Sequence, residues 1–378
     1  MQSFTVAVQF FSERMDNKFF PDILDMLERC VEAGKVPLEL VTLLLHILEK
    51  AEQEADKWES FIFIILKVFT SLAREENTRL ELIEPIFLKM LKFIAYPQLC
   101  AESKELIEAY YCIDFIYSNF HAFVHNHFSN NFHVVEMMLS HLANKLPVIR
   151  QQSNRIAVYS PLMGVFSALT DCEDLLQRAL ENNLTRIFRQ VISSLSVTIQ
   201  EDQEVVRQIY CIISATTACS ARFVEMVFAD REFLAQLLDN MQNAELEIRL
   251  ETAWSISNST CDLTIELLRM VLESNIIEVF CSLFNQYPSL KDIKGDIDWS
   301  GMFIEAFGYW LKLGEELVDN DLVLYNPVAL KLEESGAVET LKIMADYEMG
   351  KTVLTEYFGE RYDEYLARRR GLKTKRAL

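Results

Sequence analysis

The stretch Glu251-Thr-Ala-Trp-Ser-Ile-Ser-Asn-Ser-Thr260 carries more information about this chain than any other. Trp254 and Asn258 are four residues apart, so they share one face of an α-helix, and Glu251 joins that face. Such a stripe suits an extended peptide with a Lys or Arg. The amide bonds the peptide backbone, the indole packs on the aliphatic stem and the carboxylate meets the charge. The alternative is a core Trp254 with a solvated Asn258.

The composition predicts a long and almost entirely helical protein. The chain has 378 residues, 51% of them hydrophobic, with only ten Gly and eight Pro. This length exceeds one ordinary core and favours two domains or a repeat array, and the scarcity of helix breakers favours helices throughout. The eight Cys include no CxxC pair, which is typical of reduced thiols in a cytosolic or nuclear protein. No secretory signal or membrane-spanning run is expected.

The charge is unevenly distributed along the chain. The formal net charge is −20, yet the stretch after Glu364 holds six basic residues and no acid, which leaves −26 over residues 1–364. An acidic body of this kind is expected to repel nucleic acid and anionic lipid and to attract basic ligands. The alternative is that the charge serves solubility alone.

Several turns share one pattern, in which an acid and a small or polar residue are followed by Gly or Asn. Gly and Asn tolerate the left-handed conformation that ends a helix, so each turn predicts a helix boundary. Asp230-Arg-Glu-Phe supplies a further turn between the second and third of them. The four turns are Glu32-Ala-Gly, Glu181-Asn-Asn-Leu, Glu273-Ser-Asn-Ile and Glu334-Ser-Gly-Ala.

The long helix before each turn also repeats, with steps of 44 to 51 residues. Periods of roughly 40–47 residues with two or three helices each are typical of armadillo or HEAT arrays. The sequence therefore predicts an all-α, armadillo/HEAT-like, right-handed superhelical solenoid whose third helices line the concave surface. The positions aligned with Asn258 are Ser71, Asn119, Ala168, Ser214 and Tyr309.

This period divides the chain into three parts. Residues 1–25 are expected to form an N-terminal capping segment, and residues 26–366 a solenoid of about seven repeats. Residues 367–378 form a basic tail that is too charged to pack and is expected to be disordered. The acidic stretches 288–298 and 314–321 are expected to form extended loops that flank a helix around Phe303–Leu313.

No catalytic motif and no convincing metal site is found. The chain lacks a Gly-rich phosphate loop, GxSxG, HExxH and a Cys–His pattern, so we expect no enzyme activity. His121 and His125 could share a metal, but no acid or Cys lies nearby in sequence, and a loop between repeats is the preferred interpretation. No cofactor is therefore expected.

One stretch resembles a known family. Arg249-Leu-Glu-Thr-Ala-Trp-Ser-Ile-Ser-Asn258 resembles the armadillo helix of importin-α, an adaptor that carries nuclear localisation signals. The stretches that begin at Ser274, Asn326 and Thr355 resemble the next helix, the last repeat and the end of that family. The resemblance is specific over about residues 205–360, whereas upstream only the period and pattern agree.

The resemblance implies a function in nuclear protein import. In that family, Trp and Asn ladders hold the signal peptide extended and acids receive its Lys and Arg. It implies protein partners with a Lys/Arg-rich segment, importin-β or an export factor, a location in nucleus and cytoplasm, and no direct binding of nucleic acid or membrane. The implied peptide-binding residues are Glu251, Trp254 and Asn258, followed by the partly matching pairs Tyr210 with Ser214 and Phe115 with Asn119.

The chain also departs from that family. The pairs Gly164 with Ala168 and Glu305 with Tyr309 lack the aromatic–Asn match, and no basic importin-β-binding segment is visible in residues 1–28. These departures favour the alternative of an armadillo scaffold that binds one dedicated partner; a helical regulatory subunit is a third interpretation. Trp310 offers a second aromatic surface or packs in the core. The run Arg368–Arg376 itself resembles a localisation signal, which either binds an acidic groove or is solvated.

Overall fold

A computed structural model describes residues 38–53, 55–75, 78–95, 104–145, 152–196, 199–287, 298–320, 322–343 and 348–359. This part of the chain is built of helices and contains no strand, which confirms the all-α class. It divides into two compact units, Met1–Gln208 and Ile209–Leu378. The predicted capping segment (1–25) and basic tail (367–378) lie outside the described residues.

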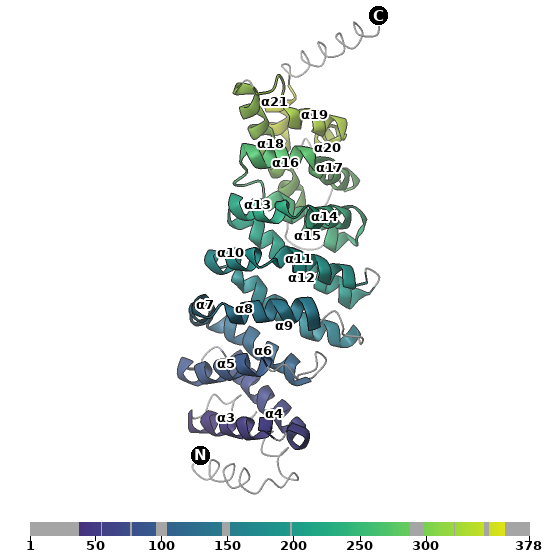
Figure 1. Cartoon of the computed structure of the whole chain (residues 1–378). Coiled ribbons are helices and arrows are strands. Elements are labelled where there is room, and N and C mark those ends of the chain that lie inside the picture. Colours follow the sequence, from purple (N-terminus) through teal and green to yellow (C-terminus); the bar gives the residue numbers. More distant parts are fainter. Residues whose placement is uncertain are drawn as a thin grey trace, which may run out of the picture. The chain divides into compact units, whose positions relative to one another are not determined.

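The described residues of unit 1 form two helix pairs followed by triplets (Figure 1). Its long helices α4, α6 and α9 pack on one another in chain order. The pairs are α3 (Leu38–Gln53) with α4 (Ala55–Arg74) and α5 (Leu80–Ile94) with α6 (Lys104–Asn119). The triplets are α7 (His121–Asn130), α8 (His133–Ser140) with the π-helical η1 (His141–Lys145), and α9 (Gln152–Leu169); then α10 (Glu173–Glu181), α11 (Leu184–Ser194) and α12 (Gln200–Cys219), which continues into unit 2.

Unit 2 continues with three further triplets (Figure 1). The second helices α14, α17 and α20 pack in order, as do the third helices α15, α18 and α21. Each unit is thus a stack of repeats, the armadillo-like solenoid architecture that the period predicts. The triplets are α13 (Ala221–Ala229), α14 (Arg231–Asn243) and α15 (Leu246–Asn258); α16 (Ile265–Glu273), α17 (Ile276–Gln286) and α18 (Trp299–Asp319); and α19 (Pro327–Glu334), α20 (Ala337–Ile343) and α21 (Glu348–Tyr357).

The predicted turns are confirmed wherever the structure describes them. Asn183, Asn275 and Gly336 have φ angles of 66°, 59° and 77°, and each separates the first helix of a triplet from the second. Only Gly, and less often Asn, adopts this conformation at little cost. At the predicted turn between α13 and α14, Asp230 caps α14 by accepting a hydrogen bond from the Phe233 N–H. The turn at Gly34 lies outside the described residues.

Aromatic side chains fill the core between neighbouring helices of unit 2. The ring of Phe280 on α17 lies 4.4 Å from that of Phe303 and 5.2 Å from the indole of Trp310, both on α18. Trp310 is fully buried, so it packs in the core and offers no second aromatic surface. The neighbouring Tyr309 points outward and is 37% exposed.

The structure corrects the predicted loop at residues 314–321. Helix α18 continues through Gly314 to Asp319, because the apolar Leu317 is buried on the same helix. Gly314 lets the next repeat approach closely: a Cβ built there would lie 2.6 Å from Cγ of Asn326. Asn326 caps α19 and also donates from Nδ2 to the Leu311 carbonyl at 2.8 Å. Of the other acidic stretch, residues 288–297 lie outside the described part.

The histidine-rich segment is also not the predicted loop. It forms helix α7, where His125 Nε2 lies 3.2 Å from the carbonyl oxygen of Ala168 and the His127 ring packs edge-on against Phe87. These residues therefore join neighbouring helices within unit 1. The described part of the chain contains no group of three or more His, Cys, Asp or Glu placed to hold a metal ion. None of its helices is long and apolar enough to cross a membrane.

Candidate peptide-binding site

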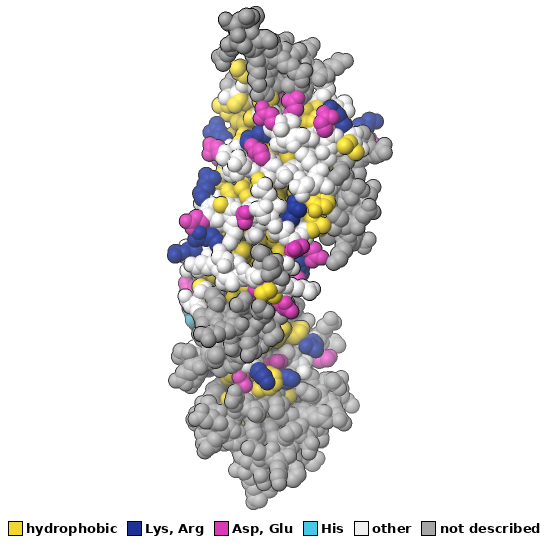
Figure 2. Space-filling view, turned by 90° about the vertical axis from the view of Figure 1, so that its right-hand side faces the viewer, with side chains coloured by type: hydrophobic (Ala, Val, Ile, Leu, Met, Phe, Trp, Pro, Cys, Tyr) yellow, Lys and Arg dark blue, Asp and Glu magenta, His cyan; other side chains and the backbone are white. Residues whose placement is uncertain are grey.

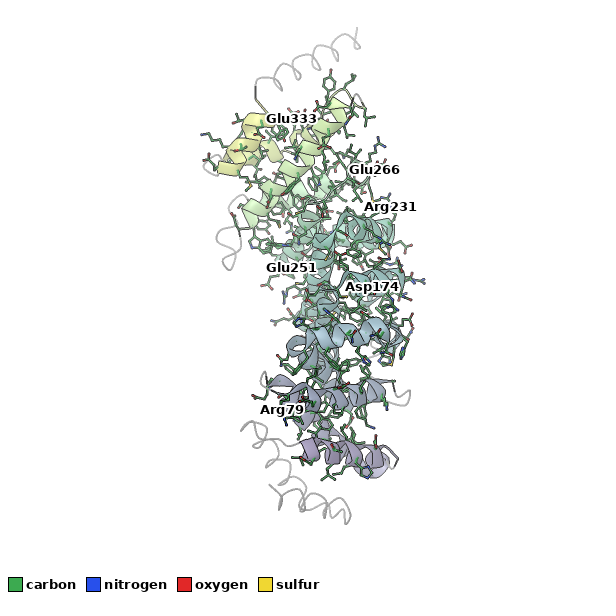
Figure 3. All side chains as sticks on the ribbon, turned by 90° about the vertical axis from the view of Figure 1, so that its left-hand side faces the viewer. Arg79, Asp174, Arg231, Glu251, Glu266 and Glu333 are labelled. Carbon is green, nitrogen blue, oxygen red and sulfur yellow. The ribbon has the colours of Figure 1, made fainter. Side chains whose placement is uncertain are left out.

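Helix α15 exposes one narrow stripe. Between Leu250 and Asn258, only Glu251, Trp254 and Asn258 are not buried. The structure therefore places the three residues on one partly exposed face. In Figure 3, Glu251 lies toward the opposite side of unit 2 from Arg231 on α14 and Glu266 on α16. The third helix thus presents its stripe away from the first and second helices.

Buried hydroxyl groups hold α15 between its neighbours. The Ser255 Oγ donates to the Tyr210 carbonyl on α12 at 3.2 Å, and Thr217 on α12 donates back to the Ser255 carbonyl at 2.9 Å. On the other side, the Ser257 Oγ donates to the Met302 carbonyl of α18 at 3.2 Å. Because these bonds are buried, they fix the rotation of α15 and with it the direction of the exposed stripe.

Asn258 is bonded through its amide nitrogen. Its Nδ2 donates to the carbonyl of Ser214 at 3.1 Å and lies 2.9 Å from the Ser214 Oγ. No described residue donates to its Oδ1. The amide can therefore accept a hydrogen bond from a peptide N–H while it remains bound to α12.

Trp254 forms a partly exposed aromatic wall. Its ring meets the ring of Trp299 edge-to-face, with 5.2 Å between centroids and an interplanar angle of 86°. Such pairs are favourable beyond the area they bury, so the contact orients the Trp254 indole. The Nε1–H of Trp299 is buried without an acceptor among the described residues.

Two hollows open on either side of this wall. The first, of about 330 Å³, is the Glu251 hollow, lined by Cys211, Ser214, Ala215, Glu251, Trp254, Asn258 and Trp299. The second, of about 500 Å³, is the Glu305 hollow, whose lining includes Trp254, Asn258, Asp298, Glu305, Tyr309 and Met349. Trp254 and Asn258 border both, so one extended ligand can cross the stripe from one hollow to the other.

Both hollows are negatively charged. Their described linings contain Glu251, Asp298 and Glu305 and no Lys or Arg. In the Glu305 hollow the pKa of Tyr309 is raised, first by neighbouring Cys261 and then by the Glu305 carboxylate. Figure 2, by contrast, shows acidic and basic side chains interspersed on the face it displays. The hollows thus combine acids without bases, an arrangement that favours cations.

Tyr210 does not reach this surface. It is fully buried, and its hydroxyl accepts a 2.6 Å hydrogen bond from Asn240 Nδ2. The exposed stripe of α12 instead contains Cys211 and Ala215, one position further along. A shift of one residue turns a helical side chain by about 100°, which separates the core face from the exposed face. Ser214 borders the Glu251 hollow but is 5% exposed and serves mainly as the partner of Asn258.

The second predicted pair lies in unit 1, where the protein itself covers it. The guanidinium of Arg74 lies over the Phe115 ring, 4.7 Å from its centroid. Asn119 Nδ2 donates to the carbonyls of Ala73 at 2.7 Å and Arg74 at 3.3 Å. The adjoining hollow, of about 340 Å³, contains Lys67 as well as Glu108. This place therefore lacks the purely acidic lining found around Trp254.

Comparison with known proteins finds only a distant likeness. No protein-family model matches the chain, and no curated protein sequence matches it. The designed armadillo repeat protein YIII(Dq)4CqI is 12% identical with a TM-score of 0.47, over 65% of this chain and 93% of that one. A protein described only as engineered is 12% identical with a TM-score of 0.48, over 92% of each chain. Likeness at this level does not identify what this chain binds.

Sequence reasoning missed several residues of the site. Trp299 follows Asp298, whose Oδ1 accepts a hydrogen bond from the Gly301 N–H and so begins α18. This capping pattern was a usable signal that Trp299 opens a third helix beside Trp254. Met349 gave no comparable signal, because its place in the Glu305 hollow depends on how α21 packs on α18.

Proposed function

We propose that this chain is a non-catalytic binding scaffold that holds an extended, Lys/Arg-containing segment of a protein partner across the Trp254 stripe. The observation that carries this proposal is the juxtaposition of Trp254 and Asn258 with an acid-lined hollow on each side. The Asn258 Oδ1 accepts a backbone N–H, and the indole packs on the stem of a basic side chain. Glu251 and Glu305 meet charges on either side.

A titration with a labelled peptide of alternating Lys and Ala tests this function. Trp254→Ala should weaken binding measurably, as expected for a central aromatic anchor. Glu225→Gln, an exposed change of the same unit outside both hollows, is the control and should leave the affinity unchanged. Equal affinities of the wild type and Trp254→Ala would remove the site from the account.

Nuclear protein import is the form of this function in which the bound segment is a nuclear localisation signal. It is supported by the resemblance of Arg249–Asn258 to the importin-α armadillo helix. Co-purification tests it: importin-β together with many basic cargoes indicates a general import adaptor. Under this proposal the ligands also dissociate as the salt concentration rises.

A scaffold with one dedicated partner is the second candidate. Two observations favour it: Tyr210 is buried, and the Arg74 guanidinium covers the Phe115 ring. Of the predicted aromatic–amide pairs, Trp254 with Asn258 is therefore the one that remains complete and accessible. A single ladder amide contributes only about 1 kcal/mol, so one such pair gives weak binding to an isolated basic peptide. Recovery of one stoichiometric partner in place of many cargoes would support this form.

A further inference from the structure

The chain carries a basic segment of its own that matches the charge of the site. Arg368–Arg376 contains six Lys or Arg residues and no acid. The described linings of the Glu251 and Glu305 hollows contain acids and no Lys or Arg. Opposite charges of this kind attract, most strongly at low ionic strength. By charge, this segment is the chain's own best candidate ligand for the site.

The last described helix brings the chain to the site. Met349, near the start of α21, lines the Glu305 hollow. Val353 of the same helix faces Gly308 of α18, where a Cβ would lie 4.0 Å from the Val353 Cγ2. Gly308 lies one turn from Glu305, so α21 runs beside the acidic hollow.

The connecting chain is long enough for the basic segment to return to the hollows. Ten residues, 358–367, separate the end of α21 from Arg368. An extended chain advances roughly 3.3–3.6 Å per residue, so these residues span up to about 35 Å. The path from Met349 to the end of α21 is only about 12 Å at about 1.5 Å per helical residue.

We propose that Arg368–Arg376 binds the Trp254 stripe of the same chain and competes with the partner's basic segment. The inference rests on the proposed function, because it gives the same site an internal occupant. A tethered segment acts at an effective concentration of about 1 mM, so even weak binding occupies the site. The partner must then displace a ligand that is always present, which lowers its apparent affinity.

A charge-neutralised full-length chain tests the competition. All six basic residues are replaced by Gln, and the labelled Lys–Ala peptide is titrated into this variant and into the wild type. A segment that binds with a Kd of about 0.1 mM at about 1 mM effective concentration weakens the probe by about tenfold. The variant is therefore expected to bind the probe about tenfold more tightly. The substitutions are Arg368→Gln, Arg369→Gln, Arg370→Gln, Lys373→Gln, Lys375→Gln and Arg376→Gln.

A second variant controls for the general change in net charge. It replaces six exposed basic residues that line none of the hollows described above, which gives the same net charge as the first variant. The control should bind the probe like the wild type, and an equal gain in both variants would overturn the proposal. Its substitutions are Arg79→Gln, Lys92→Gln, Lys104→Gln, Arg186→Gln, Arg231→Gln and Arg269→Gln.

The remaining outcomes separate this inference from the proposed function. Neutralising the segment could leave the affinity for the Lys–Ala peptide unchanged while that affinity still depends on Trp254. In that case the inference fails and the proposed function stands. If no variant binds the probe, both fail. Affinity that falls as the protein is concentrated, together with dimers in light scattering, would show the segment acting on a second copy and would overturn the intramolecular form.

Discussion

The amide nitrogen of Asn258 donates to the carbonyl oxygen of Ser214 at 3.1 Å, across 44 residues of sequence. Asn119 makes the same kind of bond in unit 1, to the carbonyl of Ala73 at 2.7 Å. In both places an Asn at the end of the last helix of a repeat is bonded to the last helix of the repeat before it. Since the donor and the acceptor of an amide are separate atoms, Asn258 can link two repeats and still accept a bond from a ligand.

This relationship predicts different effects for two matched substitutions. Asn258→Ala and Asn119→Ala should each lower the free energy of unfolding by about 1 kcal/mol, the usual net value of such hydrogen bonds. Only Asn258→Ala should also weaken binding of the Lys–Ala peptide, because only Asn258 borders the acidic hollows. Denaturant unfolding and peptide titration measure the two effects. A comparable loss of peptide affinity in Asn119→Ala would contradict the assignment.

Two glycines predict a contrast in stability. Gly314→Ala should destabilise the protein by about 1–2 kcal/mol, because the added Cβ displaces Asn326 from its cap and from Leu311. Gly164→Ala should be close to neutral. Its Cβ meets only the carboxyl group of Asp114, which no hydrogen bond among the described residues holds in place, and Ala favours a helix by roughly 0.8–1.0 kcal/mol over Gly. Thermal unfolding of both variants measures the two changes in stability. Equal losses of stability would show that displacement of Asn326 is not the cause of the loss in Gly314→Ala.

Asp114 predicts a pH dependence of stability. Burial raises its pKa from 3.8 to about 6, so the folded protein holds this proton up to a higher pH than the unfolded chain. Ionisation therefore opposes folding above pH 6, and this cost disappears as the pH falls to about 4. Asp114→Asn should be more stable than the wild type by about 1–2 kcal/mol at pH 7.5.

The difference between Asp114→Asn and the wild type should vanish near pH 4, which unfolding curves across pH 4–8 can establish. Glu136→Gln on α8 is the control, because it removes a charge from an exposed position of the same unit. A gain that is the same at every pH, or that Glu136→Gln shares, would refute the role given to Asp114.

The acids of the hollows predict a salt dependence of binding. Affinity for the Lys–Ala peptide should fall as NaCl rises from about 50 to about 300 mM, because screening shortens the range of charge attraction. Glu305→Gln should reduce both the affinity at low salt and the steepness of this fall. Titrations at several salt concentrations give the slope. An unchanged slope in Glu305→Gln would place the bound cations elsewhere.

The repeat architecture could be predicted because its signals are local. The left-handed residues Asn183, Asn275 and Gly336 lie where their turns predict them, since each conformation depends on one residue type. The stripe of Glu251, Trp254 and Asn258 depends only on spacing within one helix, and the structure shows it partly exposed. Both features follow from residue types and their spacing along the chain, without any contact between distant segments.

The rest of the site depends on register between helices, which spacing does not fix. Every face of a third helix in a stack can carry apolar residues, so an aromatic such as Tyr210 is equally compatible with the core and with the surface. The partly exposed positions of α12 are Cys211 and Ala215, one residue further along than the predicted pair, and Tyr210 is therefore buried. The contacts of Phe115 with Arg74 and of Trp254 with Trp299 join residues far apart in sequence, and only packing brings them together.

A double-mutant cycle between the protein and its ligand tests the central claim most directly. Glu251→Gln is combined with Lys–Ala peptides in which each Lys in turn is replaced by Gln, and the coupling free energy is measured for every pair. The account predicts that one peptide position couples to Glu251 by about 0.5 kcal/mol or more, and that Glu225→Gln couples to none. Additive effects at every peptide position, with no coupling to Glu251, would contradict a basic side chain bound beside the Trp254 stripe.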